Sequence, residues 1–218
     1  MRANARRLAT VFAAALCGAT LLAGCHKSGD AAASAGGGSA TDMINAPEMT
    51  MGSPSAKVKM IEYASDTCSH CARFDAEVFP GFKAKYIDTG RVHYVFREFL
   101  TPPAEVAAAS FLIARCAGRD KYFNVLDTIF RGQAQMYQSG DIKGALLHAA
   151  EGAGMTDAQF DACLTNEAAG DALSARVQHY AKDDGIDSTP TFVINGKKMD
   201  PNTPATMANL DAAIAEAR

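Results

Sequence analysis

The sequence predicts an α/β fold, in which a sheet carries helices on its faces and a helical subdomain is inserted at about residues 103–184. Two observations predict it. Strand-like runs stand near both ends of the folded part of the chain, and five consecutive helix-like segments separate them. Segments in this order fit packed layers around one core, with the helical block as an insertion.

Three strands and one long helical segment are expected before the insertion. A short strand at Met49–Met51 and a stronger one from about Lys57 to Ala64 flank a Gly-Ser-Pro turn, and residues 91–100 form a third, buried strand. Between the last two strands, apolar residues recur at four-residue spacing, which indicates a helix that Pro80 kinks or interrupts. The residues of this apolar stripe are Phe74, Val78, Phe82 and Tyr86.

Capping and turn residues divide the rest of the chain. The expected helices of the insertion span residues 104–118, 120–135, 141–153, 156–165 and 167–184. Asp120, Asp141 and Thr156 are candidate N-caps, and Gly185 is a candidate helix stop. Downstream, residues 191–199 contain an Asn-Gly turn that predicts a hairpin. Thr203-Pro204 predicts a helix start, and residues 207–217 predict the last helix.

Residues 1–24 have the layout of a secretory signal. Three arginines precede an uncharged apolar run, and small residues stand just before Cys25. The apolar run is too short and wrongly flanked for a stable membrane span. The sequence LAGC also matches the bacterial lipobox, in which the cysteine receives a lipid. We therefore expect a protein on the periplasmic side of a membrane, anchored through Cys25. The alternative is an ordinary signal, with Cys25 incidental.

The mature chain is expected to be one tethered domain. Residues 25–46 are small, polar and glycine-rich after the cysteine, which predicts a flexible linker with a reach of roughly 25 Å. Residues 47–218 form the domain. Removal of residues 1–24 takes away three of the 21 basic residues and none of the 24 acidic ones, which leaves a net charge of −6. No basic stripe remains for a nucleic acid partner.

Four of the six cysteines fall in the expected domain. An exported protein meets an oxidising compartment, where thiols usually pair. Cys68 and Cys71 are close enough in sequence to pair with each other, which leaves Cys116 with Cys163 as a structural disulfide. The alternative for Cys116 and Cys163 is two separate buried thiols.

Cys68 and Cys71 form a CxxC motif where a strand gives way to a helix. In the first turn of a helix, unpaired N–H groups and the helix dipole favour a Cys68 thiolate, and Cys71 lies one turn further on. A stabilised thiolate makes the disulfide form a better oxidant. The residues between the two cysteines, Ser69 and His70, are candidates for tuning it. His70 alternatively is a solvated residue with no electrostatic role.

The CxxC motif has three alternative uses. A zinc site needs two further ligands, and the remaining histidines of the domain are scattered singly, so no metal is expected. Haem attachment needs His after the second cysteine, where this chain has Ala72. An inert structural disulfide is the third alternative. A redox pair that needs no cofactor is the prediction.

Three stretches together resemble the DsbA-like family of thioredoxin-fold thiol:disulfide oxidoreductases. They are EYASDTCSHCARF at residues 62–74, EVFPGFKAKYIDTGRVHYVFREF at 77–99 and STPTFVINGK at 188–197. The resemblance runs from Met49 to the C-terminus and implies a thioredoxin fold with an inserted helical subdomain. Similar members carry a cysteine pair in the insertion, which supports a Cys116–Cys163 disulfide.

The resemblance also implies roles for individual residues. Cys68 would be the exposed attacking cysteine and Cys71 the buried resolving one. Thr189-Pro190 would be a cis peptide that faces them and pairs with substrate backbone. Glu62 matches an acidic residue beneath the site that could carry the proton of Cys71; the alternative is a strand-edge Glu in water. The chain departs from the best-known oxidases at Ser69, where they carry proline.

The expected function is that of a monomeric thiol oxidase. Its substrates would be unfolded exported proteins with reduced cysteines, and a DsbB-like, quinone-linked membrane partner would reoxidise it. One rival is an isomerase or reductase that a membrane partner keeps reduced. A second rival, from another class, is a non-catalytic peptide-binding lipoprotein.

Overall fold

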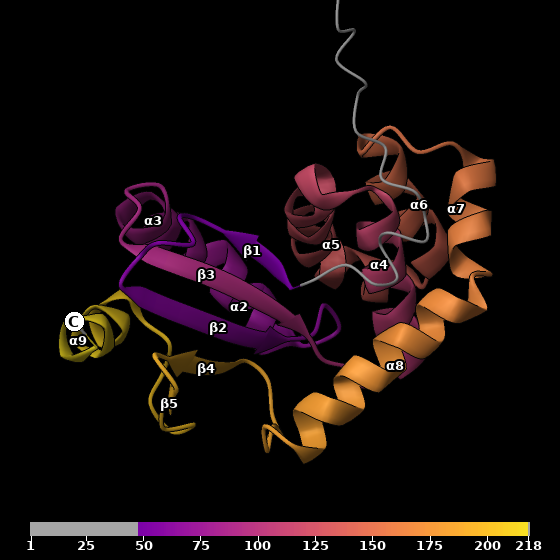
Figure 1. Ribbon diagram of the computed structural model, residues 1–218. Helices are drawn as coiled ribbons and strands as arrows, with labels where there is room; N and C mark the ends of the chain where they lie inside the picture. Colours follow the sequence, from indigo (N-terminus) through magenta and orange to yellow (C-terminus); the bar gives the residue numbers. More distant parts are fainter. Residues whose placement is uncertain (1–47, 218) are drawn as a thin grey trace, which may run out of the picture. The chain divides into compact units, whose positions relative to one another are not determined.

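A computed structural model describes residues 48–217 of the chain (Figure 1). The predicted signal at 1–24, Cys25 and the whole of the predicted linker lie outside these residues. Within residues 48–217, no helix is both long enough and apolar enough to cross a membrane.

A five-stranded mixed sheet in the order β1-β3-β2-β4-β5 forms the centre of the fold. Its strands are β1 (Met49–Met51), β2 (Val58–Ala64), β3 (Val92–Glu98), β4 (Thr191–Ile194) and β5 (Lys197–Lys198). β2 and β3 run parallel, whereas β1 pairs with β3, and β4 with β2, in the antiparallel sense. Because β2 is central, its backbone is paired on both sides. The predicted α/β class is confirmed.

The alternation of side chains along the strands decides what lies under the sheet. In register, Met60 lies opposite Tyr94 and Ile194, and Glu62 lies opposite Phe96 and Phe192. Residues two apart point to the same face. Glu62 therefore shares one face of the sheet with apolar and aromatic side chains, and that face is the main core.

Three short helical segments connect β2 to β3 across this core. They are α2 (Ser69–Glu77), α3 (Phe79–Phe82) and the π-helix η1 (Lys83–Ile87). Phe74 of α2 packs on Phe192 of β4 with ring centroids 4.8 Å apart. The predicted interruption is confirmed, because α2 ends before Val78 and Pro80 stands in the first turn of α3.

Five helices between β3 and β4 form the predicted insertion, and Figure 1 shows α4 to α7 grouped beyond one end of the sheet. Their bounds are α4 (Ala104–Cys116), α5 (Arg119–Ser139), α6 (Ile142–Gly152), α7 (Asp157–Leu164) and α8 (Glu167–Lys182). Asp141 and Thr156 cap α6 and α7 as predicted. Asp120 does not cap α5, because Gly118, with φ +91°, turns the chain directly after α4 and takes the cap position.

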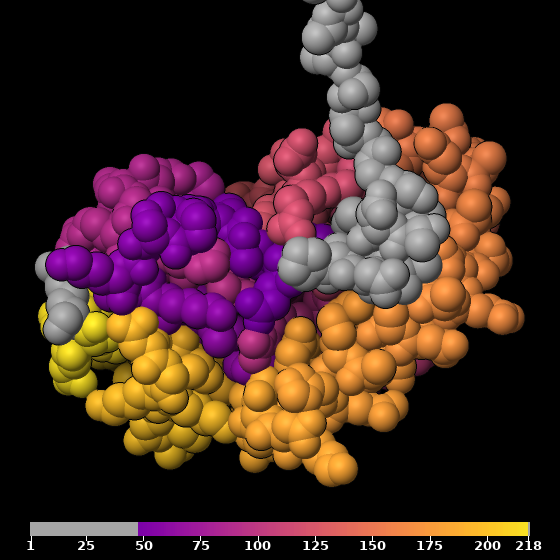
Figure 2. Space-filling model, in the orientation of Figure 1, coloured from indigo at the N-terminus to yellow at the C-terminus, as the bar shows by residue number. Residues whose placement is uncertain are grey.

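The C-terminal segments return to the sheet. β4 and β5 form the predicted hairpin, with Asn195 and Gly196 both at positive φ as a two-residue hairpin turn requires. Figure 2 shows these gold segments against the indigo N-terminal strands. The last helix, α9 (Met207–Glu216), lies in the predicted segment 207–217. It does not start at Thr203-Pro204, because the side chain of Thr206 caps it by accepting from the N–H of Asn209.

One buried carboxylate joins the insertion to the sheet. Glu98, at the end of β3, is 1% exposed and contacts the guanidinium groups of Arg115 on α4 and Arg176 on α8. Tyr122 of α5 donates to the same carboxylate at 3.0 Å. Three helices of the insertion thus meet at one residue of the sheet.

Loss of this carboxylate is expected to destabilise the protein. Glu98→Ala would remove the carboxylate from a buried ion pair with Arg115, and removal of one partner of a buried pair typically costs about 3–5 kcal/mol. The free energy of unfolding in urea measures it. Glu216→Ala, which breaks an exposed 3.3 Å pair with Lys197, is the control and should change stability by less than about 1 kcal/mol. Equal losses of unfolding free energy in the two variants would contradict the view that Glu98 joins the insertion to the sheet.

Candidate functional site

The CxxC motif stands on a turn that is fixed from several sides. Cys68 N–H donates to Ser65 O at 3.1 Å, so the chain reverses directly after β2. Thr67 donates its hydroxyl to Thr101 O at 2.8 Å. From α5, Gln133 donates to the backbone oxygen of Asp66 at 2.6 Å. The turn is thus tied both to the segment before α4 and to the insertion.

Cys68 is the N-cap of α2 rather than a residue of its first turn. Its sulfur accepts from the N–H of Cys71 at 3.4 Å and is half-buried. The side chain of Cys71, and then that of Thr189 and the nearby N–H groups, outweigh desolvation and lower the pKa of Cys68 from 9.0 to about 5. A thiolate at Cys68 is therefore the stable form at neutral pH.

Cys71 has the opposite environment. It is 1% exposed, on the side of α2 that faces the core. Burial, followed by its contact with Cys68 and the nearby charge of Glu62, raises the pKa of Cys71 well above 9.0. Neither cysteine forms a disulfide in this structure, so the pair is reduced. The reduced pair thus holds one proton, and Cys71 carries it.

Glu62 lies beneath this pair on β2, 3% exposed and not at a strand edge in water. Tyr94 of β3 donates its hydroxyl to Glu62 Oε2 at 2.6 Å. Burial raises the pKa of Glu62 to about 8, against the opposing hydrogen bond from Tyr94. A carboxyl with this pKa can give up or accept a proton near neutral pH.

The loop before β4 faces Cys68 from the other side. The Thr189–Pro190 peptide is cis, and Thr189 O lies 3.4 Å from Cys68 Sγ, which donates to it only in the thiol form. Beside it lies a cavity of about 470 Å³ between α2 and this loop. Its lining is mixed, with His70, Arg73 and Glu77 of α2 near Phe192 and Met199. A segment of peptide fits such an open, partly apolar groove.

Ser69 and His70 lie at the exposed start of α2. Among the described residues, no hydrogen bond joins either side chain to the sulfur of Cys68; the donors are backbone N–H groups and other residues. Within residues 48–217, no group of three or more His, Cys, Asp or Glu is placed to hold a metal ion.

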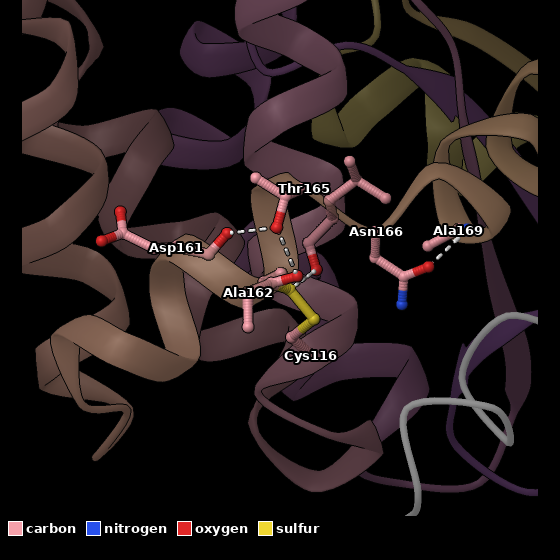
Figure 3. Close-up of a disulfide and its surroundings, with 8 residues drawn as sticks. Cys116, Asp161, Ala162, Thr165, Asn166 and Ala169 are labelled. Atoms are coloured by element: carbon pink, nitrogen blue, oxygen red, sulfur yellow. Dashed lines mark hydrogen bonds between the residues drawn. A yellow bond between two sulfur atoms is a disulfide. The ribbon is translucent and has the colours of Figure 1, made fainter.

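Cys116 of α4 is joined to Cys163 of α7 by a disulfide, with Cα atoms 6.3 Å apart. Figure 3 shows the surroundings of this bond, including Thr165, whose hydroxyl donates to Asp161 O and Ala162 O at the end of α7. The bond links helices inside the insertion, away from the CxxC motif.

Three acidic or phenolic groups around the motif were not predicted from the sequence. Tyr94 was visible only as part of a buried strand, and its partnership with Glu62 depends on the register of β2 and β3. Asp66 is completely buried, and Asp75 is partly so; both have side-chain oxygens without a hydrogen-bond partner in the described structure. Four-residue spacing marked the apolar stripe of this segment but gave no sign of a buried acid.

Comparison with known proteins places these features in a family. The family model described as Thioredoxin matches residues 45–214. A Rickettsia bellii protein, named as a protein-disulfide oxidoreductase, is 30% identical over 180 residues, which cover 82% of this chain and 69% of that protein. A Rickettsia conorii protein named in the same way is 32% identical, over 72% of this chain and 56% of its own length.

Solved structures agree with this placement. The crystal structure of Wolbachia pipientis alpha-DsbA1 superposes with a TM-score of 0.71 at 26% identity, covering 79% of this chain and 91% of that one. BdbD from Bacillus subtilis shares the fold, with a TM-score of 0.63 at 20% identity over 78% of this chain and 92% of that one. The chain therefore belongs to the DsbA-like family of thioredoxin-fold thiol:disulfide oxidoreductases.

Proposed function

We propose that this protein is a thiol oxidase that introduces disulfide bonds into exported proteins through Cys68 and Cys71. The observation that carries the proposal is the contrast between the two cysteines. The pKa of Cys68 is lowered to about 5, whereas that of Cys71 is raised. Whatever stabilises the Cys68 thiolate stabilises the reduced protein, so the oxidised protein releases its disulfide readily to a substrate.

The oxidation of a substrate would take two steps. A substrate thiolate attacks Cys68 Sγ, the Cys68–Cys71 bond breaks, and Cys71 leaves and takes a proton from Glu62. A second substrate thiolate then attacks the substrate sulfur of the mixed disulfide and expels Cys68 as a thiolate. Two electrons pass from the substrate to the pair. On reoxidation by a DsbB-like partner, Cys71 returns its proton to Glu62 and closes the disulfide.

The remaining predicted residues have supporting parts in this proposal. The Thr189–Pro190 loop and the neighbouring groove would hold the substrate in an extended conformation, because Thr189 already contacts the Cys68 sulfur. Ser69 and His70, at the exposed tip of α2, would adjust the redox potential. Cys25 would carry the lipid that keeps the domain near the membrane.

The redox equilibrium with glutathione separates oxidase from reductase or isomerase. A reduction potential of about −120 mV is expected for an oxidase. A reduction potential of about −270 mV would identify a reductant and overturn the proposal. The full chain with Cys17→Ser and Cys25→Ser is the material for the titration, because it retains the complete domain. In a non-catalytic peptide binder, Cys68 would be alkylated no faster than an ordinary thiol at neutral pH.

Substitution of Cys68 is expected to abolish catalysis. Without its sulfur no mixed disulfide forms, so Cys68→Ser should oxidise a reduced, unfolded protein no faster than the uncatalysed reaction. Substrate thiols remaining over time are counted by alkylation and mass spectrometry. The double variant Cys116→Ala/Cys163→Ala, which removes two sulfurs outside the CxxC motif, should keep its activity. Activity retained in Cys68→Ser would refute the mechanism.

The two cysteines should titrate separately towards 5,5′-dithiobis(2-nitrobenzoate). Cys68 of the reduced protein releases one thionitrobenzoate, and Cys71 then attacks the mixed disulfide and releases a second. The first rate should rise with pH to a midpoint near pH 5, because that step needs the Cys68 thiolate. The second should rise near pH 8, because Glu62 must be ionised to accept the Cys71 proton.

Tyr94→Phe should move only the second midpoint, and to higher pH. The hydrogen bond from Tyr94 lowers the pKa of Glu62, so its loss raises that pKa further. Tyr137→Phe, which changes an exposed tyrosine instead, is the matched control. An unshifted second midpoint in Tyr94→Phe would exclude Glu62 as the proton acceptor.

A further inference from the structure

A short loop, residues 184–190, carries Thr189 from the end of α8 to β4 (Figure 1). In the proposed function the backbone of Thr189 pairs with an extended substrate, so the position of this loop decides how the substrate meets Cys68. Asp187 and Ser188, directly before Thr189, are exposed and are not fixed by packing. The contacts that place Thr189 therefore have to come from the start of the loop.

Asp184 joins the start of this loop to the sheet. Its Oδ2 accepts from the Tyr63 hydroxyl of β2 at 2.9 Å and from the Arg97 guanidinium of β3 at 2.8 Å. Tyr63 and Arg97 are paired residues of the two parallel strands, and Arg97 donates to Tyr63 Oη at 2.5 Å. These three side chains, here called the clamp, therefore hold one another in a closed set of hydrogen bonds.

The clamp lies on the face of the sheet opposite to the main core. Tyr63 follows Glu62 on β2, and consecutive side chains of a strand point to opposite faces. Tyr63 accordingly packs with Tyr180 and Ile186 in a small second core. The clamp thus reaches the loop from the side of the sheet that holds neither Glu62 nor Cys71.

Arg97 is itself held from several directions. Its side chain is 17% exposed, and its Cζ lies 5.3 Å and 5.0 Å from the ring centroids of Tyr63 and Tyr180. Its Nε donates to Glu48 Oε1, just before β1, at 2.7 Å. The planar fork of an arginine can hold two carboxylates in fixed directions at once, which a lysine ammonium cannot. Asp184 therefore has a partner that is fixed in place.

The next two residues of the loop are attached as well. Lys198 of β5 donates to Gly185 O at 2.7 Å. Ile186 is 2% exposed, and its N–H donates to Tyr180 O at 3.0 Å. Three consecutive residues are thus fixed to the sheet or to α8, and Thr189 follows three residues later.

We propose that Arg97 and Asp184 are positioning residues for substrate binding, which hold Thr189 where the backbone of a substrate bound at Cys68 can pair with it. The inference rests on the proposed function. Partly exposed ion pairs contribute little net stability, so the clamp supplies position more than free energy. Arg97 and Asp184 touch no reacting atom and act through the loop. Without them Thr189 moves and backbone pairing weakens, while the chemistry at the Cys68 sulfur is retained.

Two reductants of the oxidised protein test this proposal. A synthetic peptide with two cysteines has a backbone that can pair with Thr189, whereas dithiothreitol has none. The oxidised full chain with Cys17→Ser and Cys25→Ser is mixed with an excess of either, and acid quenching, alkylation and mass spectrometry give the rate constant. Asp184→Ala should lower the rate constant for the peptide by about fivefold to tenfold, the effect expected when about one hydrogen bond to the substrate is lost. The rate constant for dithiothreitol should not change.

Glu48→Ala is the matched control, because it removes the other carboxylate that pairs with Arg97 but leaves the loop attached. Both of its rate constants should equal those of the unsubstituted chain. Arg97→Ala should show the same selective loss as Asp184→Ala. Methylguanidinium, at concentrations too low to denature the protein, should restore the peptide rate constant of Arg97→Ala but not that of Asp184→Ala.

Three results would overturn the proposal. One is a normal peptide rate constant in Asp184→Ala. Another is an equal loss with peptide and dithiothreitol, because that would indicate a general loss of structure. The third is a loss in Glu48→Ala as large as that in Asp184→Ala, because the whole ion-pair cluster would then matter and not the attachment of the loop.

The unsubstituted chain shows whether the proposed function itself fails. If it oxidises neither the peptide nor dithiothreitol faster than the uncatalysed reaction, the redox function is wrong and the clamp has no substrate to position. If it oxidises the peptide rapidly and Asp184→Ala does so equally well, the redox function stands and only the role of the clamp is refuted.

Discussion

The stabilisation of a thiolate at the N-terminus of α2 is the interaction on which the rest of the structure depends. Helix N–H groups can stabilise the Cys68 sulfur only if it sits at the cap position and Cys71 lies inside. Both conditions follow from the tight turn between β2 and α2. Hydrogen bonds from Thr67 and Gln133 fix that turn to parts of the chain far away in sequence.

The insertion therefore has a part in the site although it supplies no cysteine to it. Gln133 of α5 holds the turn directly, and α8 leads the chain back so that Thr189 meets Cys68, 121 residues earlier in the sequence. The buried cluster around Glu98 anchors α4, α5 and α8 to β3. Buried ion pairs contribute little net stability, but they define one arrangement. A defined arrangement is what the contact between Thr189 and Cys68 requires.

Most of the fold and the redox pair could be predicted because their determinants are local. The CxxC spacing, the Asn-Gly turn and the caps of α6 and α7 each lie within a few residues. The start of α9 and the cap of α5 were wrong, because neighbouring Thr206 and Gly118 competed with the chosen residues. Ser69, His70 and Cys25 stay predictions, and Cys25 lies outside the described residues.

The contacts of the buried acids could not be predicted in the same way, because they depend on how distant strands and helices are placed. Tyr94 lies opposite Met60 in the parallel pair and thereby reaches Glu62, two residues further along β2. Asp75 meets Asp127 only because α5 packs against α2. A sequence contains both residues but not their distance. Register and helix packing had to be known first.

The buried acids and the Cys68 thiolate have opposite effects on stability. Burial raises the pKa of Glu62 from 4.5 and that of Asp66 from 3.8, in both cases to about 8. Their contribution to folding is therefore complete only below those ordinary values, and it is lost as pH rises from there to about 8. The lowered pKa of Cys68 makes the reduced protein more stable above its unfolded value of 9.0, an advantage lost as pH falls towards 5. Between about pH 5 and about pH 8, the reduced pair can hold a thiolate at Cys68 and a proton at the buried Cys71. A fold without the buried acids would tolerate alkali better, but Cys71 would lose its nearest proton acceptor.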